Sequence, residues 1–417
     1  MRACFLAFQL VLTVLGVLLA SGRAEAYPWM IKHGYTVCAT CHSDPSGGEL
    51  LTGYGRLLSK EVLSTHWHGA EGSGASETAP NPPASTEEGH EFYQPFFGLV
   101  GEPESLLLGG SLRMATLFRD GDKVRAFPMQ IDLYGDYTLF RRLHLGGSLG
   151  VAKVPVGSPH ARAAQITTNQ GDGFNLLSRT HYVRFDLGEG NYTITAGRLN
   201  LPFGVRMSEH VMWVRSETAT DRESDQQHGV ALNMDFDSWR FELMAIAGNY
   251  QLNPDKLRKR GYSAYAEFSG IKGVAFGASS LITHAGSDML NPTPLTDTRQ
   301  AHGAFVRADL GRELVLMAEA DLLLHTQTKP GYVGFAQLDF EAFNGLHVIG
   351  TGEVLDSGYP KTVSEDVQPR IPGVGKAKLG GWLSTQWFFV AHFDFRLDAI
   401  VRQSEPFQLL GQLHVYL

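Results

Sequence analysis

The stretch HFDFRLDAIVR, residues 392–402, decides the fold of this 417-residue chain. Every second residue is apolar, and the residues between them are Asp394, Arg396 and Asp398, with Ile400 the one exception. A period of two is the signature of a β-strand, because successive side chains point to opposite faces. One apolar face and one charged face are typical of a strand that stands between lipid and a water-filled lumen.

The same alternation recurs along the chain from about residue 90 onward. We count about sixteen such segments: 105–119, 124–139, 142–153, 178–187, 191–199, 228–236, 238–247, 261–270, 272–284, 300–310, 313–324, 331–341, 345–356, 375–388, 392–402 and 406–417. An even number of antiparallel strands is what a single-chain bacterial barrel requires. A soluble antiparallel sandwich also alternates and stays open as the other interpretation.

The connections between these segments separate into two classes by length. Those after even-numbered segments are short, for example 140–141, 188–190, 237, 311–312 and 342–344. The long ones all follow odd-numbered segments: 154–177, 200–227, 248–260, 285–299 and 357–374. Short turns at one rim and long loops at the other are the arrangement of outer-membrane barrels, with the short turns periplasmic. We therefore predict an all-β chain, an antiparallel transmembrane β-barrel of about sixteen strands over residues 90–417.

Composition excludes two other classes of protein. Charged residues make up 19% of the chain, the net charge is -8, and no run is rich in Lys and Arg, so nucleic acid has no electrostatic support as a partner. Past the N-terminal leader, no segment approaches the roughly 20 apolar residues of a membrane-spanning helix.

The first 26 residues have the features of a secretory signal peptide. Arg2 supplies the positive start, an apolar run follows, and Ala24-Glu25-Ala26 is a small-x-small cleavage site. The alternative, an uncleaved anchor, would barely span a bilayer. We therefore expect an exported protein located in the bacterial outer membrane.

The most specific motif is Cys38-Ala39-Thr40-Cys41-His42. C-x-x-C-H is the attachment signature of a c-type haem, in which two thiols bond to the porphyrin vinyl groups and the adjacent imidazole binds the iron. A Cys38–Cys41 disulfide, half of a zinc site and coincidence are the alternatives. Zinc would need about four ligands, and no second Cys/His pair is present. We expect one covalent haem c, with His42 as the proximal iron ligand.

The distal ligand is less determined by the sequence. We rank His33 first, because it lies five residues before Cys38, and the alternatives are Met30, His66 and His68. A histidine would favour pure electron transfer, whereas an axial methionine would raise the reduction potential. The long 200–227 connection also contains polar and sulfur-bearing side chains, which we interpret as incidental or solvated: Met207, His210, Met212, Asp221, Glu223, Asp225 and, just beyond it, His228.

Residues 27–68 form the predicted haem domain, with a short helical pattern at Leu57, Leu58, Val62 and Leu63. Residues 69–89 are rich in Pro, Gly and Ser and indicate a flexible linker. Some 40 residues are close to the limit for building a core, so the haem must serve as part of it. A sixteen-stranded barrel has a lumen wide enough for a channel. We hypothesise that the haem domain sits in the barrel or against its periplasmic mouth.

The segments Tyr35-Thr36-Val37-Cys38-Ala39-Thr40-Cys41-His42, Pro45 and Leu51-Thr52-Gly53-Tyr54-Gly55-Arg56 resemble the fused monohaem cytochrome–porins of the bacterial outer membrane. That family includes outer-membrane iron oxidases, in which one c-type haem precedes a barrel of roughly sixteen strands. The chain differs from the family by the insertion-like Ser46-Gly47-Gly48-Glu49, by His33, and by lacking a lysine-and-glycine stretch after Arg56. The resemblance implies electron transfer across the outer membrane.

We therefore expect electrons to pass between an extracellular donor or acceptor, Fe(II) among them, and a periplasmic c-type cytochrome or another redox carrier. Described as an enzymatic activity, this electron transfer is that of an Fe(II):cytochrome oxidoreductase. Two alternatives stay open: a passive porin whose haem domain is a plug or docking module, and a haem enzyme with an open iron position. G-x-S-x-G, H-E-x-x-H and P-loop motifs are absent from the sequence.

Overall fold

The computed structural model describes residues 28–65, 96, 100, 103, 105–153, 163–167, 173–188, 191–207, 209–252, 255–287, 296–326, 328–358 and 377–417. The predicted signal peptide, the predicted linker, His66 and His68 lie outside the described residues. Within these ranges, no helix is both long and apolar enough to cross a membrane.

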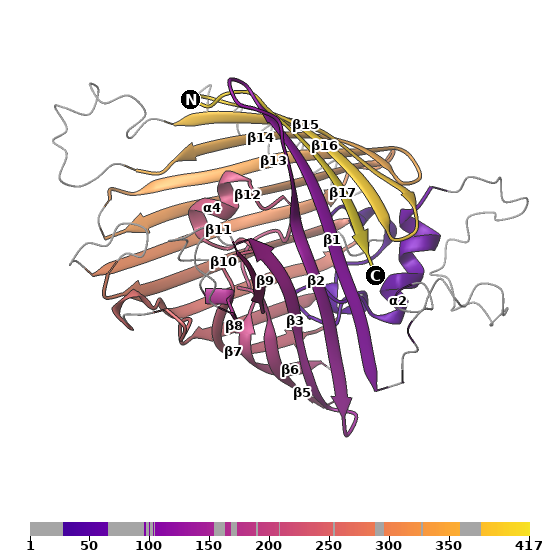
Figure 1. Cartoon of the computed structure of the whole chain (residues 1–417), viewed down its shortest axis with the longest axis vertical. Coiled ribbons are helices and arrows are strands. Elements are labelled where there is room, and N and C mark those ends of the chain that lie inside the picture. The colour runs from indigo at the N-terminus through magenta and orange to yellow at the C-terminus, as the bar shows by residue number, and fades with distance from the viewer. Residues whose placement is uncertain are drawn as a thin grey trace, which may run out of the picture.

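The described residues form one antiparallel sheet that closes on itself (Figure 1). Its strands are β1 (Leu106–Arg119), β2 (Arg125–Leu139), β3 (Leu143–Lys153), β4 (Phe174–Leu177), β5 (His181–Leu187), β6 (Tyr192–Leu199), β7 (Gln227–Asp235), β8 (Trp239–Ile246), β9 (Arg260–Ile271), β10 (Val274–Ala285), β11 (Asp297–Asp309), β12 (Leu314–His325), β13 (Gly331–Phe343), β14 (Leu346–Asp356), β15 (Lys378–Val390), β16 (Phe393–Arg402) and β17 (Gln408–Tyr416). Each strand of the wall pairs with its neighbour in sequence, and β17 pairs with β1 to close the ring. The predicted barrel of sixteen wall strands is confirmed.

One strand was missed by the sequence analysis. The short β4 lies inside the long 154–177 connection and pairs with the end of β3, beside the place where β5 pairs with the start of β3. β4 lengthens the wall locally at the end of β3, and the number of strands around the ring stays sixteen.

The wall places apolar side chains outward and charged side chains inward, the reverse of their arrangement in a soluble protein. On β16, Asp398 is 1% exposed, whereas Val401 is 62% exposed on the opposite face. The sequence exception, Ile400, is 3% exposed and belongs to an apolar cluster inside the barrel. A soluble sandwich buries its apolar faces against each other, so an apolar outer surface around a charged interior decides between the two interpretations.

The rims of the barrel differ in the length of their connections, as predicted. The short-turn rim has the turns 140–142, 236–238, 272–273, 310–313, 344–345 and 391–392, and the described parts of the long connections start from the other rim. The C-terminal residue lies at the short-turn rim too, next to Gly110.

The N-terminal segment 28–65 is seated at the short-turn rim, where Figure 1 draws it in indigo near the C-terminus. Lys32 contacts Glu313 in one of the short turns and Glu341 near the end of β13. The Thr65 amide donates to the Phe388 carbonyl at 2.9 Å, and the Ser59 hydroxyl lies 2.9 Å from that of Tyr416. The segment contains η1 (Pro28–His33), η2 (Cys38–Thr40), the α-helix α2 (Gly53–Leu58) and the π-helical turn η3 (Ser59–Leu63).

The 200–227 connection folds into the lumen and carries the short helix α4 (Trp213–Thr218), which packs on β12, β13 and β14. Buried Arg215 forms an ion pair with Glu319 of β12 at 2.8 Å. The Trp213 amide donates to Glu353 of β14 at 2.7 Å. We call residues 200–207 and 209–227 the inward loop. The interpretation of Glu223 and Asp225 as part of a solvated loop is wrong, because Asp225 is buried and Glu223 lies 3.5 Å from Arg179.

Candidate haem site

The two cysteines and His42 are brought together by one tight turn. The amides of Cys41 and His42 both donate to the Cys38 carbonyl, at 3.1 and 3.0 Å. This curls the motif so that its two sulfurs and its imidazole line the same cavity. The two thiols are not joined to each other in a disulfide.

Two glycines allow the chain to pack closely on this turn. A Cβ at Gly47, whose φ is +83°, would lie 3.1 Å from the Cys38 sulfur and 3.9 Å from Cδ2 of His42. A Cβ at Gly55 would lie 2.2 Å from the Cys41 carbonyl oxygen. Residues 43–49 therefore cover the His42 side of the motif, and α2 packs directly against its backbone.

Helix α2 connects the motif to the barrel. The Thr52 hydroxyl caps the helix by accepting from the Gly55 amide at 3.1 Å, and it donates to the Thr40 carbonyl at 3.1 Å. Buried Arg56 donates to the Leu108 carbonyl of β1 at 2.6 Å. The Leu51–Arg56 motif thus has a structural explanation: it fixes the C-x-x-C-H turn to the first strand of the wall.

The cavity has about 1620 Å³ of empty space, including its opening to solvent. Its apolar lining comes from the N-terminal segment and from the inward loop, and includes Met30, Leu58, Leu63, Val205 and Met207. Its polar lining includes several wall arginines together with Ser111, Gln130 and Tyr134 of β1 and β2. An apolar space with polar groups at its margin is the general form of a cofactor site.

His42 has the protonation state that iron ligation needs. Burial, reinforced by Arg222 and opposed by Asp44, lowers the pKa of His42 to about 4. The imidazole is therefore neutral at pH 7, and neutral imidazole is the form that binds metals. Its Nδ1 atom is buried and has no hydrogen-bond partner among the described residues. The residues present thus fit a c-type haem: two thiols, one neutral imidazole and an apolar space beside them.

Five arginines hold the backbone of the motif in place, and we call them the arginine collar. Their guanidinium groups donate to five carbonyls on either side of the motif: Arg307 to Thr36 at 3.4 Å, Arg184 to Ser43, Arg240 to Pro45, Arg206 to Ser46 at 3.0 Å, and Arg222 to Ser46 at 2.9 Å and to Gly47. Three come from β5, β8 and β11, and two from the inward loop. The collar therefore fixes the segment from both the wall and the lumen.

The charges of the collar are compensated by wall carboxylates. Glu242 lies 2.7 Å from Arg206 and 2.6 Å from Arg240, and Glu267 lies 2.7 Å from Arg307. Arg240 also approaches the Cys38 sulfur at 3.4 Å. Buried arginines are tolerated where each is paired, and a planar guanidinium serves a carboxylate and a carbonyl at once.

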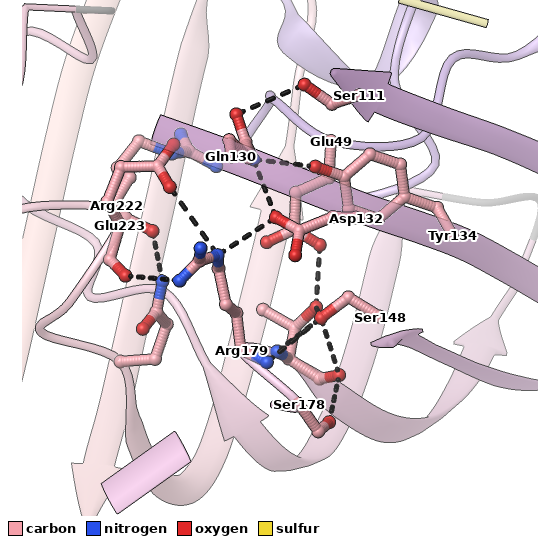
Figure 2. Close-up of polar contacts among 12 residues, drawn as sticks. Glu49, Ser111, Gln130, Asp132, Tyr134, Ser148, Ser178, Arg179, Arg222 and Glu223 are labelled. Carbon is pink, nitrogen blue, oxygen red and sulfur yellow. Dashed lines mark hydrogen bonds and ion pairs between the residues drawn. The ribbon is translucent and has the colours of Figure 1, made fainter. Parts of the chain in front are cut away.

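A second polar network lies at the margin of the cavity (Figure 2). Arg179 donates to Asp132 at 2.9 Å and lies 3.5 Å from Glu223 of the inward loop. Glu49, from the turn after the motif, accepts from the Thr180 hydroxyl at 2.6 Å. Burial raises the pKa of Glu49 to about 7; the Thr180 hydrogen bond opposes this shift, and the charge of Asp44 adds to it.

The predicted distal ligands take different positions. His33 faces the wall, where its Nε2 lies 3.8 Å from Glu341, and it is not among the residues that line the cavity. Met30 does line the cavity, whereas His66 and His68 lie outside the described residues. Met207 and His210, interpreted from the sequence as incidental, line the same cavity as the C-x-x-C-H motif.

The arginine collar escaped the sequence analysis. Its members lie on four separate stretches of chain, and each is an ordinary arginine in an alternating or loop pattern. The one available signal was that several inward positions of the predicted strands carry arginine opposite an acid, as in Arg240 with Glu242.

Comparison with solved structures finds bacterial outer-membrane barrels. OmpT of Vibrio cholerae, folded in vitro, is 11% identical with a TM-score of 0.54, over 75% of this chain and 99% of its own. OmpF of Salmonella typhi, solved in complex with daunomycin, is 12% identical with a TM-score of 0.53, over 75% and 97%. The outer membrane channel DcaP of Acinetobacter baumannii is 10% identical with a TM-score of 0.50, over 76% and 99%. At this identity the likeness shows a porin-like barrel fold.

Neither a family model nor a curated protein matches the sequence. The porin-like fold is thus common to the chain and its structural neighbours, whereas the candidate haem site rests on this chain's own residues.

Proposed function

We propose that this protein is an outer-membrane electron conduit, in which one c-type haem on Cys38 and Cys41 is carried inside a porin-like barrel. The observation that carries the proposal is the cavity that both sulfurs and His42 line together, enclosed between the N-terminal segment and the inward loop. A haem bound there supplies a one-electron Fe(III)/Fe(II) couple. Lipid insulates the two sides of a membrane, so a redox centre in a protein-lined hole is reachable from both.

Different groups of the described residues have different roles in such a site. Cys38 and Cys41 attach the porphyrin, His42 ligates the iron, and the apolar lining excludes water from one part of the cavity. The arginine collar fixes the motif so that the geometry of the site is the same in every molecule. Fixed geometry serves electron transfer, because it leaves little to reorganise when the charge of the iron changes.

The membrane location is supported by the outer surface of the wall. Large apolar side chains are exposed on strand after strand, for example Leu133, Leu243, Leu338, Leu383 and Val401. An apolar outer band around a polar interior matches a barrel whose partner is outer-membrane lipid. With short turns on the periplasmic side, the N-terminal segment would face the periplasm, where a c-type cytochrome or another carrier exchanges electrons with it.

The passive porin is the second candidate, and the porin-like fold favours it. The inside of this barrel argues against free diffusion. The N-terminal segment occupies the short-turn mouth, and the inward loop crosses the lumen with its buried Arg215–Glu319 pair. A wide solute pathway would need both to move away. The haem-enzyme alternative would require an iron position open to substrate.

Sealed proteoliposomes test the proposal. The purified protein is reconstituted with a soluble c-type cytochrome trapped inside, and Fe(II) or a poised electrode is supplied outside. We expect reduction of the trapped cytochrome that depends on the protein. Failure of haem-loaded protein to reduce the trapped cytochrome would reject the conduit.

The matched control is the double variant Cys38→Ala/Cys41→Ala, which keeps the barrel and removes both attachment points. Haem staining after denaturing electrophoresis should be lost together with electron transfer. Covalent haem retained in this variant would refute the assignment of the motif, and unchanged transfer without haem would point to solute leakage through a porin.

A further inference from the structure

The inward loop has two limbs, and they flank the cavity on opposite sides. The outbound limb is held on β10 and β12, where the Gly204 amide donates to Ser279 at 2.8 Å and the Val205 amide donates to Glu319 at 2.6 Å. It then reaches β16, where Glu209 lies 2.8 Å from Arg396. The return limb runs on the other side, where Glu223 lies 3.5 Å from Arg179, next to β5.

His42 belongs to the side of the return limb. Arg222 of that limb donates to the carbonyls of Ser46 and Gly47, and Gly47 abuts the imidazole. The His42 face of a bound porphyrin is therefore covered by the motif's own turn together with the return limb.

Met207 belongs to the outbound limb and lines the cavity with its side chain largely buried. The preceding residue, Arg206, donates to Ser46 at 3.0 Å and lies over the Tyr265 ring at 4.6 Å from its centroid. Arg206 and Arg222 donate to the same Ser46 carbonyl, so the outbound limb, which carries Met207, is also tied to the motif turn.

The N-terminal segment is too small to enclose a haem by itself, so a residue from the barrel part of the chain is needed to cover it. Fewer than about 40 residues rarely build a core that covers a large ligand on all sides. Residues 43–49 already cover the His42 face, so the opposite face is left to the barrel.

We infer that Met207 is the second axial ligand of the haem iron, so that the cofactor bound by the N-terminal segment is completed by a thioether from the barrel's own inward loop. This inference rests on the proposed haem site. It makes the iron's coordination depend on docking: only a segment seated in the lumen has both axial ligands. An axial methionine also raises the reduction potential relative to histidine.

Two other side chains in the cavity are the competitors. Met30 belongs to η1, which packs on β11 and β12, and its neighbour Trp29 stacks on His347 with ring centroids 4.1 Å apart. His210 is half-buried near the carboxylates of Asp221 and Glu223, whose pKa values respond to it. Met30 is thus anchored to the wall at the rim, and His210 lies beside the carboxylates of the return limb.

The test is the absorption spectrum of the purified full-length protein and of Met207→Leu. In the oxidised parent protein we expect the weak red band that reports sulfur ligation to ferric haem, and in the reduced protein no binding of carbon monoxide. Met207→Leu should lose the red band, bind carbon monoxide when reduced, and show a lower midpoint potential. A spectrum unchanged by this substitution would overturn the inference.

Matched variants separate ligation from packing. Met212→Leu changes a fully buried methionine of the same loop that does not line the cavity, and its spectrum should equal that of the parent protein. Loss of the red band in Met30→Leu, with the band kept in Met207→Leu, would assign the ligand to Met30 instead. Met207→His should restore a six-coordinate spectrum of bis-histidine type, a rescue that a packing role would not give.

The outcomes also separate this inference from the proposed haem site. If the parent protein has no covalent haem, both fail. If haem is attached to Cys38 and Cys41 but Met207→Leu leaves the spectrum unchanged, only the axial-ligand inference fails.

Discussion

The barrel wall and the N-terminal segment are stabilised by different kinds of interaction. The wall is continuous and hydrogen-bonded from β1 to β17, with apolar side chains outward and charges inward. The segment 28–65 has only short helical turns, and its backbone carbonyls are bound by arginines of the wall and the inward loop. The wall therefore specifies its own structure, whereas the segment takes its structure from the wall and the inward loop.

This difference teaches which parts of the chain depend on which. The arginine collar needs the wall for its compensating carboxylates, so the segment cannot keep its shape outside the lumen. The wall has no such dependence, because its strands pair with one another. Changes in the segment should therefore spare the barrel, and changes in the wall should remove both.

Deleting residues 28–65 is the strongest way to test this asymmetry. We expect a folded barrel without haem whose single-channel conductance is higher than that of the full chain, because the short-turn mouth is emptied, although the inward loop still crosses the lumen. Planar-bilayer recordings measure the change. A deletion variant that fails to form a heat-modifiable barrel would show that the wall also depends on the segment.

Lysine substitutions on the two faces of β13 test which face of the wall is directed toward lipid. Leu338→Lys introduces a cation at a lipid-facing position near the middle of β13 and should destabilise the barrel by about 2–4 kcal/mol. Gln337→Lys places the same charge inward, beside Glu209, and should cost far less. Urea unfolding in detergent or lipid vesicles gives both values. Equal losses for the two variants would contradict the assigned faces.

Gly55→Ala tests the close contact between α2 and the motif. Alanine is the better helix former, which would favour stability, but its Cβ would lie 2.2 Å from the Cys41 carbonyl oxygen. We expect the clash to dominate and the haem content per barrel to fall severalfold, with the barrel intact. Gly53→Ala is the matched control, because a Cβ there meets nothing within 4 Å. Similar haem contents in the two variants would argue against this packing.

Glu49 gives the smallest expected effect, a pH dependence of the docked segment. Its pKa rises from 4.5 unfolded to about 7 in the fold, so the folded state binds more protons between these values. Stability should therefore fall as the pH rises from about 4.5 through 7. Thermal unfolding followed at the haem should show a midpoint a few degrees lower at pH 8 than at pH 5.5. Glu49→Gln should reduce this difference, and an unchanged difference would assign it to other groups.

The wall could be predicted from the sequence because it repeats one physical rule. In HFDFRLDAIVR the alternation alone places Asp394, Arg396 and Asp398 inward, and the structure agrees. The alternation of apolar and polar residues did not predict every strand. Ile400 faces inward as the alternation requires and joins an apolar cluster there, whereas β4 was missed because it is a strand of only four residues inside a long connection.

The site could be predicted only as far as its local motif reaches. Cys38, Cys41 and His42 lie within five consecutive residues, and their tight turn brings them to one cavity. Met207 and the collar arginines lie more than a hundred residues away, and the route of the inward loop decides whether they meet the motif. That route depends on buried pairs such as Arg215 with Glu319, which no local pattern indicates.

The central claim is that one haem is bonded to the chain through Cys38 and Cys41 within a barrel. Intact-mass analysis of the protein purified from outer membranes and fully denatured measures this directly. We predict the mass of the mature chain plus a single haem, with haem absorption following the same species. A mass equal to the polypeptide alone, in protein exported by a host that matures c-type cytochromes, would contradict it.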